Sequence, residues 1–142
     1  MTARAISQQK ILRILDANFN RAKEGVRVCE DVARFVLDDK NLAAHFKKIR
    51  HELSRILLSF PVSYLRLLEA RNSRADVAKE HDIRDKKTAG WQDIMMANLK
   101  RSQEAIRVLE ECSKVLSPRH AVTFGKLRFA CYELEKRSLQ KF

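Results

Sequence analysis

Asparagine, arginine and glutamate recur at one spacing in two separate stretches of the chain. The pattern appears at Asn18, Arg21 and Glu24 and again, 80 residues later, at Asn98, Arg101 and Glu104. Planar arginine side chains hold phosphate oxygens through paired hydrogen bonds, and amides both donate and accept. The two triplets therefore predict a polar pocket for an anionic, phosphorylated ligand.

A structural interpretation of the same residues stays open beside the functional one. Asn18 falls inside an apolar stripe, three residues after Leu15 and four before Ala22. A buried amide needs hydrogen-bond partners, so it either bonds to a neighbouring helix or to its twin, or faces a ligand-bearing gap. The arginines either form surface ion pairs with nearby glutamates or clamp a ligand.

Small residues accompany both triplets. Glycine inside a helix costs about 1 kcal/mol relative to alanine, so Gly25 indicates a close approach by another element. Ala105 keeps a small residue at the equivalent position. Asp16 points elsewhere on the helical wheel and has no acidic counterpart. Arg27 and Glu30 are interpreted as exposed ion-pair residues.

These residues sit on an internal repeat of long helices. Residues 14–37 align without gaps to 94–117, with eight of 24 pairs identical. Apolar periodicity predicts helices over 7–37, 42–58, 62–70 (with Pro61 in its first turn), 91–116 and 118–136. The expected fold is an all-α bundle, one domain over 1–142. Its repeat units, 7–58 and 91–138, would be related by a pseudo-two-fold axis and joined by 59–90.

Residues 71–88 form a charged connection within that linker. Ten of these eighteen residues are charged, and they show no sustained apolar period. Such a segment is either a functional or mobile loop or a solvated connection.

Composition narrows the classes of function. The net charge of +11 over 142 residues attracts anions: nucleic acid, an acidic membrane or phosphorylated small molecules. No apolar run is long enough to span a bilayer and the N-terminus lacks an apolar signal core, so we expect a cytoplasmic protein. The three cysteines are interpreted as buried hydrophobes, and the four histidines show no metal-binding spacing.

Three segments resemble a known family. Residues 15–31 (LDANFNRAKEGVRVCED), 97–111 (ANLKRSQEAIRVLEE) and 70–77 (ARNSRADV) are similar to the small helical hydroxymethylpyrimidine-phosphate kinases of bacterial thiamine biosynthesis. That domain is often joined to the front of thiamine-phosphate synthase. The chain departs from the family pattern at Ala78, where glycine is frequent, and at Cys29, where leucine is favoured.

The resemblance implies ATP-dependent phosphorylation of hydroxymethylpyrimidine phosphate to its diphosphate, with Mg²⁺ and with thiamine-phosphate synthase as functional partner. The implied phosphate- and substrate-binding residues are Asn18, Arg21, Arg71, Asn98 and Arg101. The implied catalytic carboxylates are Glu24, Asp76 and Glu104, with Asp16 and Glu24 as magnesium ligands. A (β/α)8 barrel needs at least about 200 residues, so this chain would supply the kinase step or an accessory role. A homodimer is compatible with this assignment.

Two other functions fit the same sequence. A non-catalytic basic helical module would bind nucleic acid or a protein partner, although aromatic residues are not interleaved with the basic ones. A different small-molecule enzyme would use the arginine-rich pocket for another phosphorylated or carboxylate substrate.

Overall fold

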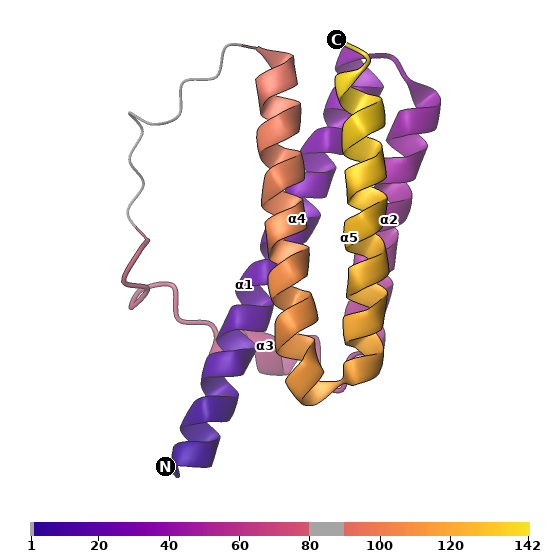
Figure 1. Ribbon diagram of the computed structural model, residues 1–142. Coiled ribbons are helices and arrows are strands. Elements are labelled where there is room, and N and C mark those ends of the chain that lie inside the picture. Colours follow the sequence, from indigo (N-terminus) through magenta and orange to yellow (C-terminus); the bar gives the residue numbers. More distant parts are fainter. Residues whose placement is uncertain (1, 80–89) are drawn as a thin grey trace.

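The computed structural model describes residues 2–79 and 90–142, and within these residues the regular structure is entirely helical. The helices are α1 (Ala3–Asp31), α2 (Lys40–Ser59), α3 (Tyr64–Ala70), α4 (Trp91–Leu116) and α5 (Pro118–Leu139) (Figure 1). The all-α prediction is confirmed. Within the same ranges, no helix has both the length and the apolar character needed to cross a bilayer.

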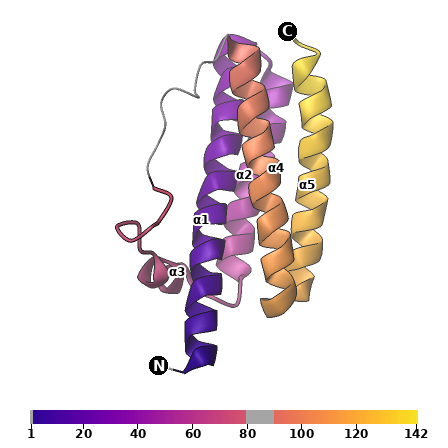
Figure 2. The ribbon, with the colours of Figure 1, turned by 60° about the vertical axis from the view of Figure 1, so that its left-hand side comes forward.

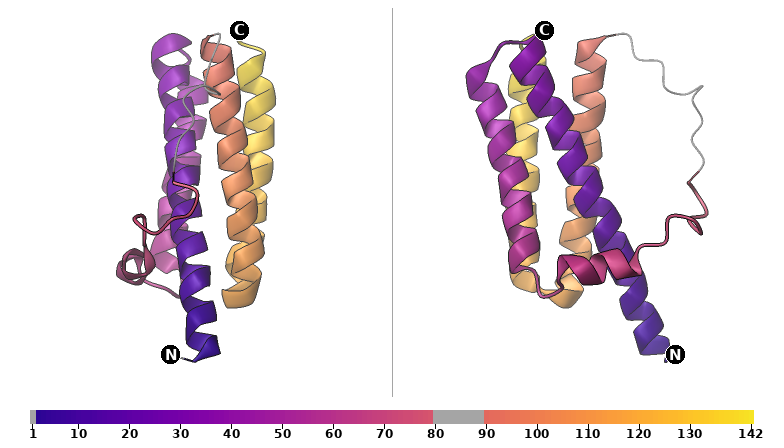
Figure 3. Two further views of the ribbon diagram at one scale, coloured as in Figure 1. Left: turned by 90° about the vertical axis from the view of Figure 1, so that its left-hand side faces the viewer. Right: turned by 180° about the vertical axis from the view of Figure 1, so that it is seen from behind.

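The four long helices pack as a bundle. α1 lies against α2 and α4, while α5 lies against α4 and α2 (Figure 1). The short helix α3 lies across α1 near one end of the bundle, and the N-terminal turns of α1 extend past that end (Figures 2 and 3). The exposed N-terminal turns of α1 therefore project beyond α3 (Figures 2 and 3).

The predicted helix over 7–37 changes its hydrogen bonding near its end. α1 continues into a π-helical turn over Val32–Val36, closed by Leu37 N–H donating to the Val32 carbonyl at 3.0 Å. Asp38 then adopts a positive φ of 49°, which stops the helix. The Asp39 carboxylate accepts from Leu42 N–H at 2.9 Å and begins α2.

The predicted place of Pro61 in the first turn of the third helix is wrong. α3 begins at Tyr64, because the Ser63 hydroxyl caps it by accepting from Arg66 N–H at 3.3 Å. Pro61 lies in the preceding connection. At the start of α5 the expectation is confirmed, with Ser117 as the N-cap and Pro118 at the first helical position. The predicted loop is non-helical over 71–79, and its remainder lies outside the described residues.

The core follows the predicted apolar stripes. Phe19 stacks edge-to-face on Phe60 and Phe124, with ring centroids 6.0 and 5.7 Å apart. Cys29 and Cys131 are buried, and burial raises the pKa of each thiol to about 12, so neither is a thiolate at neutral pH. His120 is also buried, between hydroxyls of the α2 end and the α5 N-cap. These residues have structural roles.

α1 and α4 approach each other closely at Gly25. A Cβ added there would lie 2.3 Å from Ser102 Oγ and 2.9 Å from the Asn98 carbonyl oxygen. The Ser102 hydroxyl donates to the Ala22 carbonyl oxygen at 3.2 Å, so it bonds one helix to the other. The predicted close approach at Gly25 is confirmed.

We expect Gly25→Ala to lower the free energy of unfolding by about 1–3 kcal/mol, because the added methyl overpacks the α1–α4 contact against backbone. Gly125→Ala is the matched control, since its Cβ would meet only the flexible end of Glu110 at 3.2 Å. There the gain in helix propensity, about 1 kcal/mol, opposes any cost. Urea unfolding of both variants measures the difference, and equal midpoints would contradict the close-contact argument.

Candidate functional site

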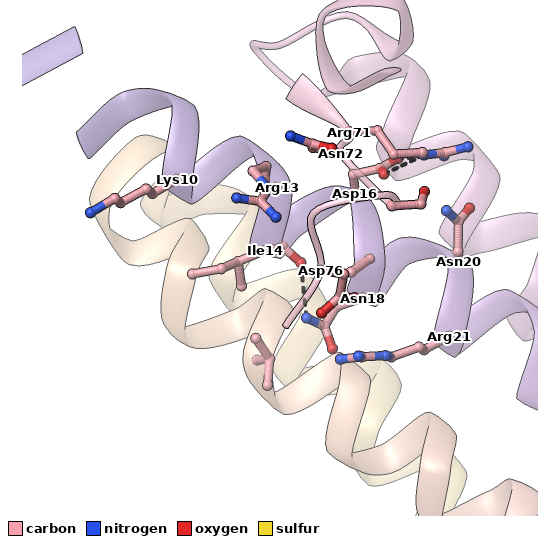
Figure 4. A pocket seen from close by; sticks show the side chains of 13 residues that line it. Lys10, Arg13, Ile14, Asp16, Asn18, Asn20, Arg21, Arg71, Asn72 and Asp76 are labelled. Carbon is pink, nitrogen blue, oxygen red and sulfur yellow. Dashed lines mark hydrogen bonds and ion pairs between the residues drawn. The ribbon is translucent and has the colours of Figure 1, made fainter. Parts of the chain in front are cut away.

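Two adjoining pockets open along α1, the smaller against α4 and the larger mainly against the loop after α3. The larger encloses about 860 Å³ and the smaller about 460 Å³, and both are lined by Asn18, Arg21 and Val108. The loop after α3 forms a further wall of the larger pocket (Figure 4). We call the two pockets together the α1–α4 groove. Four of the six triplet residues line it, namely Asn18, Arg21, Arg101 and Glu104.

The two repeated asparagines make the same local bond but have different surroundings. The side-chain nitrogen of Asn18 donates to the Ile14 carbonyl at 2.8 Å, and that of Asn98 donates to the Ile94 carbonyl at 2.9 Å. Both amides are therefore satisfied within their own helices, and neither bonds to its twin. Asn18 also lines both pockets of the groove, whereas Asn98 lines neither.

Arg21 of α1 and Arg101 of α4 both line the smaller pocket, and both are exposed to solvent. Neither forms an ion pair with a carboxylate in residues 2–79 or 90–142. The predicted alternative, pairing with a nearby glutamate, is therefore not seen for these arginines. Two guanidinium groups from different helices line one pocket together with a single carboxylate, that of Glu104, so the described lining carries a net positive charge, which attracts an anion.

Arg71 has a different role from the other predicted clamps. Its Nε and Nη2 atoms donate to the two carboxylate oxygens of Asp16, each at 2.7 Å (Figure 4). Hydrogen bonds to this carboxylate raise the pKa of Arg71 above its ordinary value, against the opposing effect of burial. Asp16 is buried and its charge is compensated, so the pair fixes the end of α3 onto α1.

Asp16 projects from α1 in another direction than Asn18. It still lines the groove, because its ion pair with Arg71 holds the loop after α3 on that side of the helix. The loop over 71–79 folds back over this side of α1 and extends the pocket around the helix (Figure 4). Its turns are stabilised by two acidic or amide side chains: Asn72 accepts from Ala75 N–H at 3.2 Å and Asp76 from Ala78 N–H at 3.0 Å.

The predicted carboxylates are only partly brought together. Asp76 lines the larger pocket and Glu104 the smaller one, whereas Glu24 is exposed and lines neither. Asp16 and Glu24 lie eight residues apart on one helix, about 12 Å along its axis, so they do not face one ion directly. Within 2–79 and 90–142, no three histidine, cysteine or acidic residues gather as a metal site.

Several lining residues were not predicted from the sequence. Lys10 and Arg13 of α1 and Asn72 and Ser73 of the loop contribute to the larger pocket. Lys10 stands four residues before Ile14 and eleven before Arg21, which places all three on one side of the helix. That spacing was the available signal for Lys10. The loop residues lie in the segment 70–77 that carries the resemblance, but no spacing within that segment singled out Asn72 or Ser73.

Comparison with known proteins gives one family match and a set of relatives. The ThiD2 family model matches residues 13–137. A protein of Nostoc punctiforme named thiamine-phosphate synthase is 38% identical over 129 residues, which are 90% of this chain and 35% of that protein. One from a Synechococcus species with the same name is 36% identical over 142 residues, 99% of this chain and 38% of that protein.

A Rhodopirellula baltica protein, also named thiamine-phosphate synthase, is 34% identical over 123 residues, 86% of this chain and 32% of that protein. The chain thus spans about a third of the length of the curated relatives it matches. No solved structure matches it.

We expect Asp16→Asn to release the 71–79 loop from α1, because it removes the charged acceptor that holds Arg71. Losing a partly buried charged hydrogen bond of this kind costs about 1–3 kcal/mol, so cleavage by trypsin after Arg74 should rise about 10-fold or more. Mass spectrometry of the fragments locates the cut.

Glu30→Gln is the matched control for this experiment. The interpretation of Glu30 as an exposed ion-pair residue is wrong, because Glu30 is also a buried carboxylate of α1. Its partner is Arg50 of α2, with Nε to Oε2 at 2.7 Å, away from the loop. We expect it to lower overall stability without selective cleavage after Arg74. Equal cleavage in the two variants would show that Asp16 does not hold the loop.

Proposed function

The chain belongs to the ThiD2 family, and from this membership we propose that it acts in thiamine biosynthesis as a kinase. The proposed reaction transfers the γ-phosphoryl group of ATP to hydroxymethylpyrimidine phosphate and gives the diphosphate. Thiamine-phosphate synthase, the name that the relatives carry, is the proposed functional partner that uses the product. The described residues are helical, whereas a synthase barrel of the (β/α)8 type requires parallel strands.

The observation that carries this proposal is the placement of Arg21 and Arg101 on one pocket without an acidic partner among the described residues. Phosphoryl transfer requires little covalent chemistry from a protein, because positioning and charge stabilisation provide most of the rate enhancement. Two guanidinium groups that converge from α1 and α4 provide both. Asn18, which lines both pockets, is the proposed hydrogen-bonding group for the aminopyrimidine or its phosphate.

The proposed reaction needs no side chain that removes a proton. An oxygen of the pyrimidine phosphate attacks the γ-phosphorus, the bond from that phosphorus to its bridging oxygen breaks, and ADP leaves. The second pKa of a phosphate monoester is about 6, so the attacking oxygen is already ionised at neutral pH. We therefore assign Asp76 and Glu104, the two pocket carboxylates without an arginine partner in the described chain, to Mg²⁺ and its waters.

The residues of the groove fit a magnesium ion delivered with its nucleotide. Mg²⁺ in such sites usually takes one or two carboxylates, substrate phosphates and waters rather than a cage of protein ligands. Asp76 is exposed on the wall of the larger pocket, where its carboxylate accepts a hydrogen bond from Ala78 N–H of its own loop. Bound there, the ion would neutralise phosphate charge. Glu24 lies outside both pockets and takes no part in this proposal.

The direct test incubates the full chain with ATP, Mg²⁺ and the pyrimidine monophosphate and detects the diphosphate by mass spectrometry. Arg21→Gln and Arg101→Gln should each lower kcat/KM about 100-fold, the usual effect of removing one preorganised charged donor. The matched controls are Arg27→Gln and Arg107→Gln, six residues further along the same helices. These arginines already pair with Asp31 and Glu111 at 3.5 and 3.2 Å, and we expect less than a twofold change.

No diphosphate with the wild-type chain would reject the kinase. In that case steeply salt-dependent binding to duplex DNA or RNA would instead support the alternative of a non-catalytic basic module. Equal losses in all four arginine variants would show that general positive charge, rather than the pocket, is responsible.

The twin asparagines provide a second prediction. Asn18→Ala and Asn98→Ala each remove the same bond to the carbonyl four residues earlier, so we expect similar small changes in thermal stability. Only Asn18→Ala should lower kcat/KM, by about 10-fold or more, because only Asn18 lines the groove. Equal activity losses would assign both asparagines to the fold alone.

A further inference from the structure

The α1–α4 groove extends beyond the residues used by the proposed function. From the pocket shared by Arg21 and Arg101 it runs toward the N-terminal turns of α1, where Lys10 and Arg13 line its larger part (Figure 4). Neither residue belongs to a repeated triplet, and α4 supplies no equivalent lysine or arginine to either pocket at this end. The basic residues of the groove therefore form two groups.

The two groups are separated along one stripe of α1. Lys10, Ile14, Ala17 and Arg21 follow one another at intervals of four, three and four residues, so they share one side of the helix. The axial rise from Arg13 to Arg21 is about 12 Å, and from Lys10 to Arg21 about 16 Å. Between the two groups the stripe presents only the uncharged side chains of Ile14 and Ala17.

Both groups carry charge that the described part of the protein leaves uncompensated. Neither Lys10 nor Arg13 forms an ion pair within 2–79 or 90–142, and the same holds for Arg21 and Arg101. By contrast, Arg71 in the same wall is fully engaged by Asp16. Cations that line a concave surface without partners attract and hold anions.

We propose that the groove holds two distinct anion subsites. The inner subsite, formed by Arg21 and Arg101, takes the single phosphate of the acceptor. The outer subsite, formed by Lys10 and Arg13, takes the polyphosphate chain of a nucleoside triphosphate. This inference rests on the proposed kinase function and adds residues to it. The outer subsite lies in the larger pocket, the inner subsite lies in the smaller one, and Arg21 lines both.

Separation of the subsites has a physical consequence for two anionic substrates. A single cluster of four cations would bind either substrate anywhere, and each would then displace the other. Two groups whose α1 members lie about 12 Å or more apart along the helix axis can hold both anions at once, and the reacting phosphates would meet beside Asn18, which lines both pockets. Asp76 stands in the wall of the outer pocket, where a magnesium ion bound to the nucleotide would meet it.

The test uses the full chain with inorganic phosphate and inorganic tripolyphosphate, whose ³¹P resonances are followed separately by NMR titration. The variants are the doubles K10Q/R13Q and R21Q/R101Q, and the matched control is R27Q/R107Q, which removes the same charge from the same two helices outside the groove. We expect K10Q/R13Q to weaken tripolyphosphate binding about 10- to 100-fold and phosphate binding less than twofold.

R21Q/R101Q should weaken phosphate binding about 10- to 100-fold and tripolyphosphate binding less than twofold. R27Q/R107Q should change both affinities less than twofold. Saturating tripolyphosphate should leave phosphate bound to the wild-type chain. Mutual displacement of the two ligands, equal losses in both groove variants, or no binding of either ligand would each overturn the proposal.

These measurements need no turnover, so they separate the subsites from the kinase. If the chain forms no diphosphate, but each groove double variant weakens the binding of a different ligand, the two subsites exist and the proposed reaction does not occur. An active kinase in which K10Q/R13Q leaves the KM for ATP unchanged has the reaction and lacks the outer subsite.

Discussion

The contact of α1 with α4 at Gly25 is the constraint on which the rest of the structure depends. Because Gly25 has no side chain, the Asn98 carbonyl and Ser102 approach its backbone closely, and Ser102 bonds to the Ala22 carbonyl. The helices thus touch on one side of this point, and the groove opens on the side lined by Ala105 and Val108. This contact fixes the crossing of the two helices and thereby brings Arg21 and Arg101 to one pocket.

The charged residues of the described chain fall into two groups: those paired with an opposite charge inside the bundle, and those without such a partner. Glu30 pairs with Arg50 and Glu110 with Arg128, so each long helix is joined to its return helix by a shielded ion pair. Hydrogen bonding and the nearby guanidinium lower the pKa of Glu30 despite its burial, so it remains charged at neutral pH. These pairs satisfy charges inside the bundle, whereas Arg21 and Arg101 of the groove form no ion pair within residues 2–79 and 90–142.

Sequence periodicity predicted the helices well because each apolar stripe repeats over many turns, and tertiary contacts reinforce it. The boundaries depended on single caps, which is why Ser63 rather than Pro61 begins α3. The site was harder to predict. Arg21 and Arg101 were found from their repetition, but the partner of Asp16 lies 55 residues away in a loop without apolar period. No local pattern shows that Arg71 positions a wall of the pocket rather than a phosphate.

Residues that recur 80 positions apart in the sequence have unequal surroundings in the structure. Asn18 and Asn98 make the same bond, and Glu30 and Glu110 make equivalent ion pairs, so local helix geometry and hairpin packing account for keeping those residue types in both copies. The loop over 71–79, however, occurs once in the chain, and Asp16 anchors it beside Asn18. Met96 stands at the position equivalent to Asp16, so α4 has no carboxylate to hold a second loop of this kind. Within residues 2–79 and 90–142, the larger pocket is therefore built mainly from α1 and this loop, which the Asp16–Arg71 ion pair joins.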